Sequence, residues 1–225
     1  MSYILSIETS TTVCSTALHH EGKLIAFEII HTPNSAASQL AVMIERVLTK
    51  AAGSLQAVAV SSGPGSYTGL RIGVATAKGI CYALSIPLIS VNSLEIMTSE
   101  VNSKLRITNS KFCPMIDARR MEVYTMLFDS KLDVVSPVEA KVIDATSFAD
   151  ELQKNEILFF GNGAMKCKEV ITHPNAKFID NIFPSAEWMG ELALTSFKKQ
   201  KFENIADFEP AYLKDFIAKK PKSLV

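Results

Sequence analysis

The stretch YILSIETSTTVCSTALHH, residues 3–20, brings an apolar run to an acid at Glu8, turns through polar residues and returns as a second apolar run. The later stretch FCPMIDARRMEVYTMLFD, residues 112–129, repeats this order around Asp117. Apolar runs rich in β-branched residues on both sides of a polar turn predict paired strands. The two stretches together indicate a faint internal duplication, and therefore two related lobes.

Strands and helices alternate through the rest of the first half. The run KLIAFEII, residues 23–30, predicts a third strand, so a three-stranded meander opens the chain. Apolar spacing then predicts a helix over 35–53, a strand over 57–63, a helix over 67–85 and a strand over 87–91. Such alternation is typical of an α/β fold with mixed, mostly parallel sheets flanked by helices.

The boundary between the lobes is expected in the polar stretch 98–111. Beyond it, a strand leads into glycines at 156–164, and a helix is predicted over 185–200. We expect an N-terminal lobe over 1–104, completed by the C-terminal segment 206–225, and a C-terminal lobe over 105–205.

Composition excludes several classes of protein. With 225 residues, 48% of them hydrophobic, the chain can bury a substantial core, so disorder is not expected. The 23 Lys and Arg residues equal the 23 Asp and Glu residues, so any contact with RNA must be local. No stretch has the length of a membrane span, and the first residues have no positively charged start of a secretion signal.

Cysteine and histidine positions give no sign of a metal site. The four cysteines contain no CxxC pair, and the four histidines form neither HxxxH nor HExxH. Reduced, buried thiols are the simplest interpretation, and they favour a cytoplasmic protein.

A glycine-rich turn lies in SSGPGSYTGLRIGVATAKGI, residues 61–80. Its glycines permit positive φ, so backbone N–H groups could converge on an anion at the start of the next helix. However, neither GxxxxGK[ST] nor GxGxxG is present, which favours a purely structural turn. The residues that could lie near an anion or nucleotide are Ser10, Gly63, Gly65, Ser66 and Arg71.

Small residues recur every four positions along the helix that follows, at Gly69, Gly73, Ala77 and Cys81. Such a stripe allows another backbone to approach closely, either in a partner or in the protein's own sheet. The preceding helix has an apolar sector broader than a surface helix needs, including Ala41, Ile44 and Leu48. We treat both sets as a candidate partner interface, with core packing as the alternative.

Glu8 and Asp117 are the acids at strand ends beside turns, where a cleft between lobes would lie. They are candidates for acid–base chemistry, or else turn acids that accept backbone N–H groups. The lysine-rich end of the chain is either a solvated terminus or an arm that contacts RNA. Its lysines are Lys214, Lys219, Lys220 and Lys222.

Four segments together resemble the bacterial TsaB (YeaZ) family, which is related to peptidase M22 and was once labelled a glycoprotease. They are ILSIETSTTVCSTAL, SSGPGSYTGLRIGVATAKGI, IDARRMEVYTMLF and EPAYLKDF, in that order. The resemblance implies two duplicated lobes, as in actin, Hsp70 and the sugar kinases. Each lobe would have a ribonuclease H-like fold. The resemblance also implies a non-catalytic partner of TsaD in threonylcarbamoyl transfer to adenosine 37 of ANN-decoding tRNAs.

In that role the chain would have no cofactor of its own, and ATP or ADP and the metal would lie on the partner proteins. The implied partners are TsaD through the glycine turn and the two helices, the ATPase TsaE, and tRNA through the complex. Whether the isolated chain forms a homodimer stays open, and no membrane contact is implied.

The sequence departs from the catalytic pattern in two places. TPNSAASQLAVMIERVL, the counterpart of the TsaD segment that carries metal-binding histidines, contains no histidine. An actin-type phosphate loop has Asp-x-Gly, whereas this chain has Glu8 and Ser10. We therefore do not expect independent nucleotide hydrolysis. The alternative hypothesis is a stand-alone nucleotide-binding ATPase of the actin-like superfamily, and a protease is the least favoured hypothesis.

Overall fold

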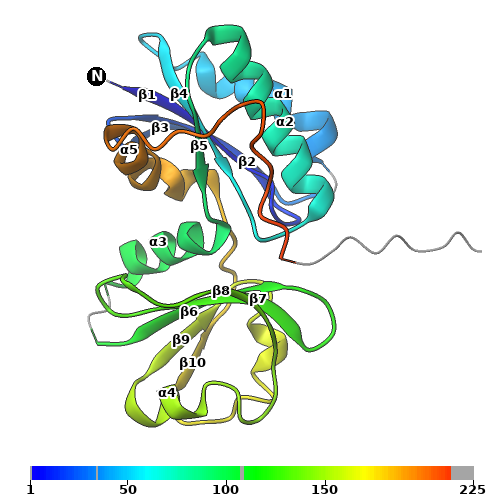
Figure 1. Ribbon diagram of the computed structural model, residues 1–225, viewed down its shortest axis with the longest axis vertical. Coiled ribbons are helices and arrows are strands. Elements are labelled where there is room, and N and C mark those ends of the chain that lie inside the picture. Colours follow the sequence, from blue (N-terminus) through cyan, green and yellow to red (C-terminus); the bar gives the residue numbers. More distant parts are fainter. Residues whose placement is uncertain (1, 34, 107–108, 214–225) are drawn as a thin grey trace, which may run out of the picture.

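The computed structural model describes residues 2–33, 35–106 and 109–213, which form two α/β lobes stacked along the long axis of the molecule (Figure 1). The first lobe contains a five-stranded sheet in the order β3-β2-β1-β4-β5. β1 and β3 both pair antiparallel with β2, whereas β4 and β5 continue the sheet in parallel. The strands are β1 (Tyr3–Glu8), β2 (Cys14–His20), β3 (Lys23–Ile30), β4 (Leu55–Ser61) and β5 (Leu88–Val91).

The second lobe repeats this topology. Its sheet has the order β10-β9-β6-β7-β8, with β7 antiparallel to β6 and β8, and with β9 and β10 parallel to β6. The strands are β6 (Lys111–Asp117), β7 (Glu122–Phe128), β8 (Val134–Val142), β9 (Ile157–Phe160) and β10 (Ala176–Ile179). The expected duplication is confirmed, and the chain has two α/β lobes whose sheets have the same strand order.

Helices cover both faces of the first sheet (Figure 1). On one face, α1 (Ala36–Leu48) and α2 (Tyr67–Leu84) pack over Leu5 and Val58, and on the other α5 (Gly190–Lys198) packs over Ile4. Because successive residues of a strand point to opposite faces, apolar side chains at neighbouring positions fill two separate cores.

The lobe boundaries differ from the expected ones because α5 and the 3₁₀ helix η2 (Ala186–Met189) pack on the first sheet, although they follow the second sheet in the chain. Residues 98–105 are also not a linker, since α3 (Ser93–Leu105) includes them. α3 lies between the two sheets (Figure 1). Its Ile96 packs in the first lobe and its Met97 in the second.

The remaining helices of the described residues are short and lie in the second lobe: α4 (Ala149–Lys154) and the 3₁₀ helix η1 (Met165–Cys167). None of the helices in the described part of the chain has the length and apolar character needed to cross a bilayer. All four cysteines are buried and free, as expected.

A segment that we call the strap, residues 203–212, returns the chain to the first lobe. The Glu203 N–H donates to the Leu88 carbonyl over 2.9 Å, and the Ala211 N–H donates to the Ser62 carbonyl over 2.8 Å. Phe208 packs against the core beneath α1 and α2. Residues 214–225, the rest of the segment expected to complete this lobe, lie outside the described residues and include the four terminal lysines.

Candidate functional site

The glycine turn packs directly on the turn between β1 and β2. The Ser66 N–H donates to the Ser10 carbonyl over 2.6 Å. A Cβ atom on Gly65 would overlap that carbonyl oxygen, and a Cβ on Gly69 would overlap the Thr9 carbonyl oxygen. These glycines are therefore required for contact between two segments of the same chain. The structural interpretation of the turn is correct for both positions.

Glu8, at the end of β1 directly before this turn, has no exposed surface. Its carboxylate accepts a hydrogen bond from the Ser10 N–H, while its other oxygen, Oε2, has no hydrogen-bond partner among the described residues. Burial raises the pKa of Glu8 to about 7, because desolvation disfavours the charged form. Glu8 is thus a buried turn acid, which is one of the two roles considered for it.

The other candidate anion-binding residues come together around the same turn. The Ser66 hydroxyl caps α2 by accepting the Gly69 N–H over 3.2 Å. A Cβ on Gly63 would come within 3.2 Å of the Ala211 carbonyl oxygen, so the strap lies against this part of the turn. Ser10 is 1% exposed. Its hydroxyl has no hydrogen-bond partner among the described residues, whereas the Ser66 hydroxyl and the Arg71 guanidinium are engaged within the chain.

Arg71 connects the start of α2 to the strap through contacts with two tyrosines. Its guanidinium lies over the Tyr67 ring, 4.1 Å from the centroid, and its Nε donates to the Tyr212 hydroxyl over 3.2 Å. The two tyrosine rings are 4.9 Å apart, centroid to centroid. The hydrogen bond to Tyr212 raises the pKa of Arg71, which is a permanent cation in any case. Arg71 is therefore part of a clamp between two segments.

The stripe of small residues on α2 faces inward, which corrects its assignment to a partner interface. Ala77 and Cys81 have no exposed surface, and a Cβ on Gly73 would overlap the Thr9 hydroxyl. Gly69 is half-buried, and its carbonyl accepts the Thr9 hydroxyl over 2.8 Å. Gly69 and Gly73 allow α2 to lie against the β1–β2 turn, and Gly73, Ala77 and Cys81 are buried and unavailable to another protein.

The apolar sector of α1 divides between core and surface. Ile44 is 6% exposed and Leu48 packs against the same core, so neither forms a partner surface, and Ile44 in particular was misassigned. Ala41 is exposed, as is its neighbour Val42 at 41%. Of the positions proposed on α1, only Ala41 is fully available to a partner.

A different set of residues, most of them small, faces outward. We call it the helix surface. It comprises Ala41 and Val42 on α1, and Ala75, Gly79, Tyr82 and Ala83 on α2, all of them exposed. A Cβ built on Gly79 meets no atom within 4 Å, and Tyr82 is 82% exposed. Sequence reasoning identified Ala41 but missed the members on α2, although the small residues at 75, 79 and 83 have the same spacing as the inward stripe.

The equivalent region of the second lobe is organised differently. Asp117, at the end of β6, accepts the Arg119 N–H over 3.0 Å and forms an ion pair with Lys166. Its own N–H donates to the Asn162 side chain over 3.1 Å. Asp117 is exposed, unlike Glu8. Its contacts are those of a turn acid whose carboxylate is balanced by a lysine.

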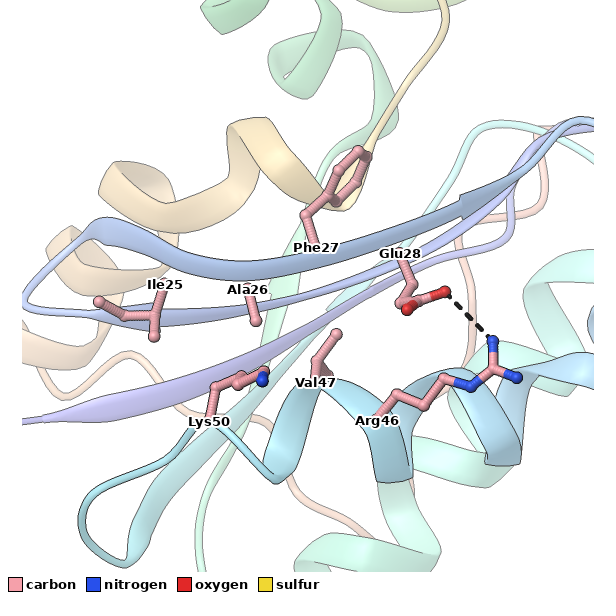
Figure 2. Close-up of a pocket in the computed structure, with 7 residues that line it drawn as sticks. All are labelled: Ile25, Ala26, Phe27, Glu28, Arg46, Val47 and Lys50. Atoms are coloured by element: carbon pink, nitrogen blue, oxygen red, sulfur yellow. Dashed lines mark ion pairs between the residues drawn. The ribbon is translucent and has the colours of Figure 1, made fainter.

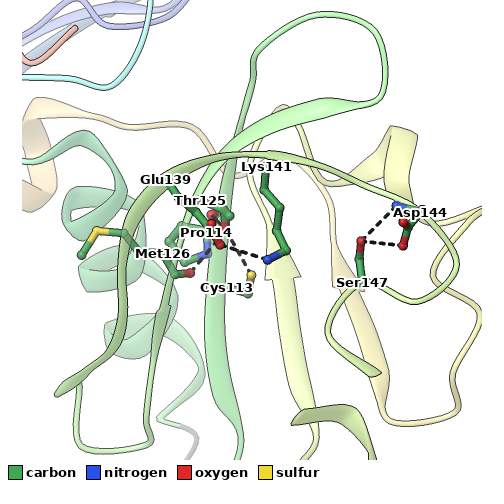
Figure 3. Close-up of polar contacts among 8 residues, drawn as sticks. All are labelled: Cys113, Pro114, Thr125, Met126, Glu139, Lys141, Asp144 and Ser147. Carbon is green, nitrogen blue, oxygen red and sulfur yellow. Dashed lines mark hydrogen bonds and ion pairs between the residues drawn. The ribbon is translucent and has the colours of Figure 1, made fainter. Parts of the chain in front are cut away.

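Two cavities lie away from both turns. One, of about 510 Å³, lies between β3 and α1, where Arg46 and Glu28 form an ion pair at 3.6 Å (Figure 2). The other, of about 620 Å³, lies along β7, β8 and α4. Beside it, the buried Thr125 hydroxyl donates to the Pro114 carbonyl over 2.9 Å, and Lys141 pairs with Glu139 at 3.0 Å (Figure 3).

Neither cavity brings together a set of catalytic groups that the sequence predicted. In residues 2–33, 35–106 and 109–213, no group of three or more His, Cys, Asp or Glu side chains could hold a metal ion. The geometry of the described residues therefore points to the helix surface and the two turns.

Comparison with known proteins decides the family. The model of the family described as "TsaD: tRNA N6-adenosine threonylcarbamoyltransferase" matches residues 32–225. Curated relatives named tRNA threonylcarbamoyladenosine biosynthesis protein TsaB match over nearly the whole chain. The one from Haemophilus influenzae is 24% identical over 94% of this chain and 93% of its own. The one from Buchnera aphidicola subsp. Baizongia pistaciae is 28% identical over 94% of this chain and 98% of its own.

The chain belongs to the TsaB/YeaZ family. The TsaB protein of Escherichia coli is 38% identical over a shorter region, 42% of each chain. The solved structure of YeaZ from Pseudomonas aeruginosa has a TM-score of 0.81 at 24% identity, over 95% of this chain and 100% of the other. This chain therefore shares the two-lobed TsaB/YeaZ fold over almost its full length.

Proposed function

We propose that this chain is a non-catalytic partner that binds and activates TsaD in the formation of N6-threonylcarbamoyladenosine at position 37 of ANN-decoding tRNAs. The names of its relatives support a role in this pathway. The observation that carries the proposal is the helix surface, whose exposed alanines and glycine would let helices of another protein approach closely.

The packing of the glycine turn supports the non-catalytic part of the proposal. The β1–β2 turn, rather than a ligand, lies against Gly65 and Gly69. The chain then needs no cofactor of its own, while nucleotide and metal lie on its partners. TsaE would be recruited to the complex, and tRNA would be bound through it in the cytoplasm. A homodimer of the isolated chain would use the same helix surface.

The variant Gly79→Arg tests the helix surface without being expected to lower the stability of the fold. The position is open, and replacing a glycine inside a helix by arginine favours the helix by about 0.8 kcal/mol. A long charged side chain should nevertheless hold a second helix away. We expect affinity for TsaD, measured by calorimetry, to fall at least about tenfold, because a spoiled central contact costs more than 1.4 kcal/mol.

Thr195→Arg is the matched control, since Thr195 is an exposed position of α5 on the opposite face of the sheet. It should leave both melting temperature and affinity unchanged. Equal affinity of the Gly79→Arg variant and the wild type would reject the helix surface. Turnover of ATP or peptide by the isolated chain would reject the non-catalytic role.

A further inference from the structure

The turn between β6 and β7 holds two arginines in an unfavourable backbone conformation. Arg119 has φ of 72° and Arg120 has φ of 49°, and both residues are exposed. The left-handed region costs a residue with a side chain about 1–2 kcal/mol, and hairpin turns that need it ordinarily use Gly, Asn or Asp. Stability alone would therefore favour other residues here.

The guanidinium groups are also not used to hold the fold together. Among the described residues, none of the ion pairs includes Arg119 or Arg120. The nearby Asp117 is instead balanced by Lys166. Both exposed guanidinium groups therefore remain available to an external partner.

The position of the turn is one at which α/β proteins bind ligands. It follows β6, and Asn162 and Lys166 follow β9, so these residues gather at the carboxyl ends of two parallel strands. Strained backbone is commonly found at functional sites, where a side chain must be held in a position that relaxed geometry would not give.

We propose that the Arg119–Arg120 turn contacts the phosphate backbone of RNA, so that this chain holds tRNA directly. The inference rests on the proposed function, in which tRNA is the substrate of the complex. Arginine suits the contact because its planar guanidinium can bind a phosphate through two hydrogen bonds.

Two alternatives fit the turn less well. The site of a small nucleotide is usually a concave pocket, whereas this turn lies at the end of a hairpin, and the two cavities described above lie elsewhere. An interface with an acidic protein would be expected to have buried apolar anchors at its centre, whereas the turn offers two exposed charges.

The test is the double variant Arg119→Asn with Arg120→Gly, in the full chain. Relief of backbone strain should raise the melting temperature, whereas loss of two cations should weaken tRNA binding about tenfold. The slope of log affinity against log salt concentration should become shallower by about 1.5, because two phosphate contacts are lost. Binding is measured by fluorescence anisotropy of unmodified, end-labelled tRNA, for the chain alone and for its complex with TsaD.

Arg106→Gly is the matched control. Arg106 is also an exposed arginine with positive φ, 48°, but it ends α3. This variant should gain stability in the same way and keep its tRNA affinity. Wild-type affinity and salt slope in the double variant would overturn the proposal. The proposal would also be overturned if the double variant bound tRNA normally but no longer associated with TsaD, because the turn would then be a protein contact. Failure of the wild-type complex to modify tRNA would instead count against the proposed function, and the binding experiment would still decide the role of the turn.

Discussion

The two lobes contain sheets of the same strand order, but the carboxyl ends of their first strands are covered in different ways. In the first lobe, Glu8 is buried beneath the glycine turn, and the strap lies against that turn. In the second lobe, Asp117 is exposed, beside a turn with two arginines that have no ion pair among the described residues. The comparison shows that strand topology places a site, while local contacts decide whether it is open.

The largest effect is expected where the first lobe is closed. Gly69→Ala would place a methyl group against the Thr9 carbonyl oxygen, and the backbone on either side has little room to move. We expect a loss of about 3 kcal/mol in the free energy of unfolding, which exceeds the gain of about 1 kcal/mol from alanine in a helix. Urea unfolding monitored by circular dichroism measures the difference.

Gly79→Ala, on the same helix, is the matched control. Its new methyl group points into open space, so only the gain in helix propensity should appear. If the two alanine variants had the same stability, the close contact between α2 and the β1–β2 turn would be rejected, and with it the view that this end of the sheet is closed.

Some of this organisation could be predicted from the sequence. The paired strands around Glu8 and Asp117 were predicted because alternating apolar runs and a polar turn are local signals. α3 was missed because its apolar residues contact both lobes, so Ile96 and Met97 point in different directions and leave no single apolar stripe.

Burial in the tertiary structure was the part that local patterns could not reveal. α2 has small residues on two sides, and their spacing is identical, so nothing in the sequence distinguishes Gly73 facing inward from Gly79 facing outward. Likewise, Glu8 and Asp117 occupy equivalent positions in the sequence. Distant residues contact Asp117 as well, at Asn162 and Lys166, but only Glu8 is buried in the folded chain.

The second prediction uses this difference between the two acids. Because the native pKa of Glu8, about 7, lies above its ordinary value of 4.5, the native state binds this proton more tightly than the unfolded chain does. The resulting stabilisation is complete below pH 4.5 and is lost as the pH rises through about 7. At pH 8 the free energy of unfolding of the Glu8→Gln variant should therefore exceed that of the wild type by up to about 3 kcal/mol. At pH 4.5 the two values should be nearly equal.

Asp117→Asn provides the comparison in the second lobe. Its exposed pair with Lys166 is worth less than about 1 kcal/mol, so the variant should differ little from the wild type at either pH. Thermal melts of both variants across this pH range make the measurement. A Glu8→Gln variant that followed the wild type at every pH would mean that the carboxyl is not desolvated by the glycine turn.

The smallest effect is expected at the end of the strap, where Tyr212 is exposed, whereas Phe208 of the same segment packs against the core. Tyr212→Ala removes the ring and hydroxyl that bind Arg71 at the surface, an interaction worth about 0.5–1 kcal/mol. Because the exposed clamp holds only this segment, global stability should change little, while the strap opens more often. Hydrogen exchange of the Ala211 amide, which donates to the Ser62 carbonyl, should therefore become several-fold faster, since 1 kcal/mol is close to a fivefold change in the opening equilibrium. Tyr82→Ala removes a more exposed tyrosine ring from α2, the helix that carries Arg71, and it should leave this amide unchanged. If Ala211 kept its full protection without Tyr212, the backbone contacts of the strap would suffice to hold it. The first lobe would then be closed by its main chain, and the side-chain clamp would have no part in the difference between the lobes.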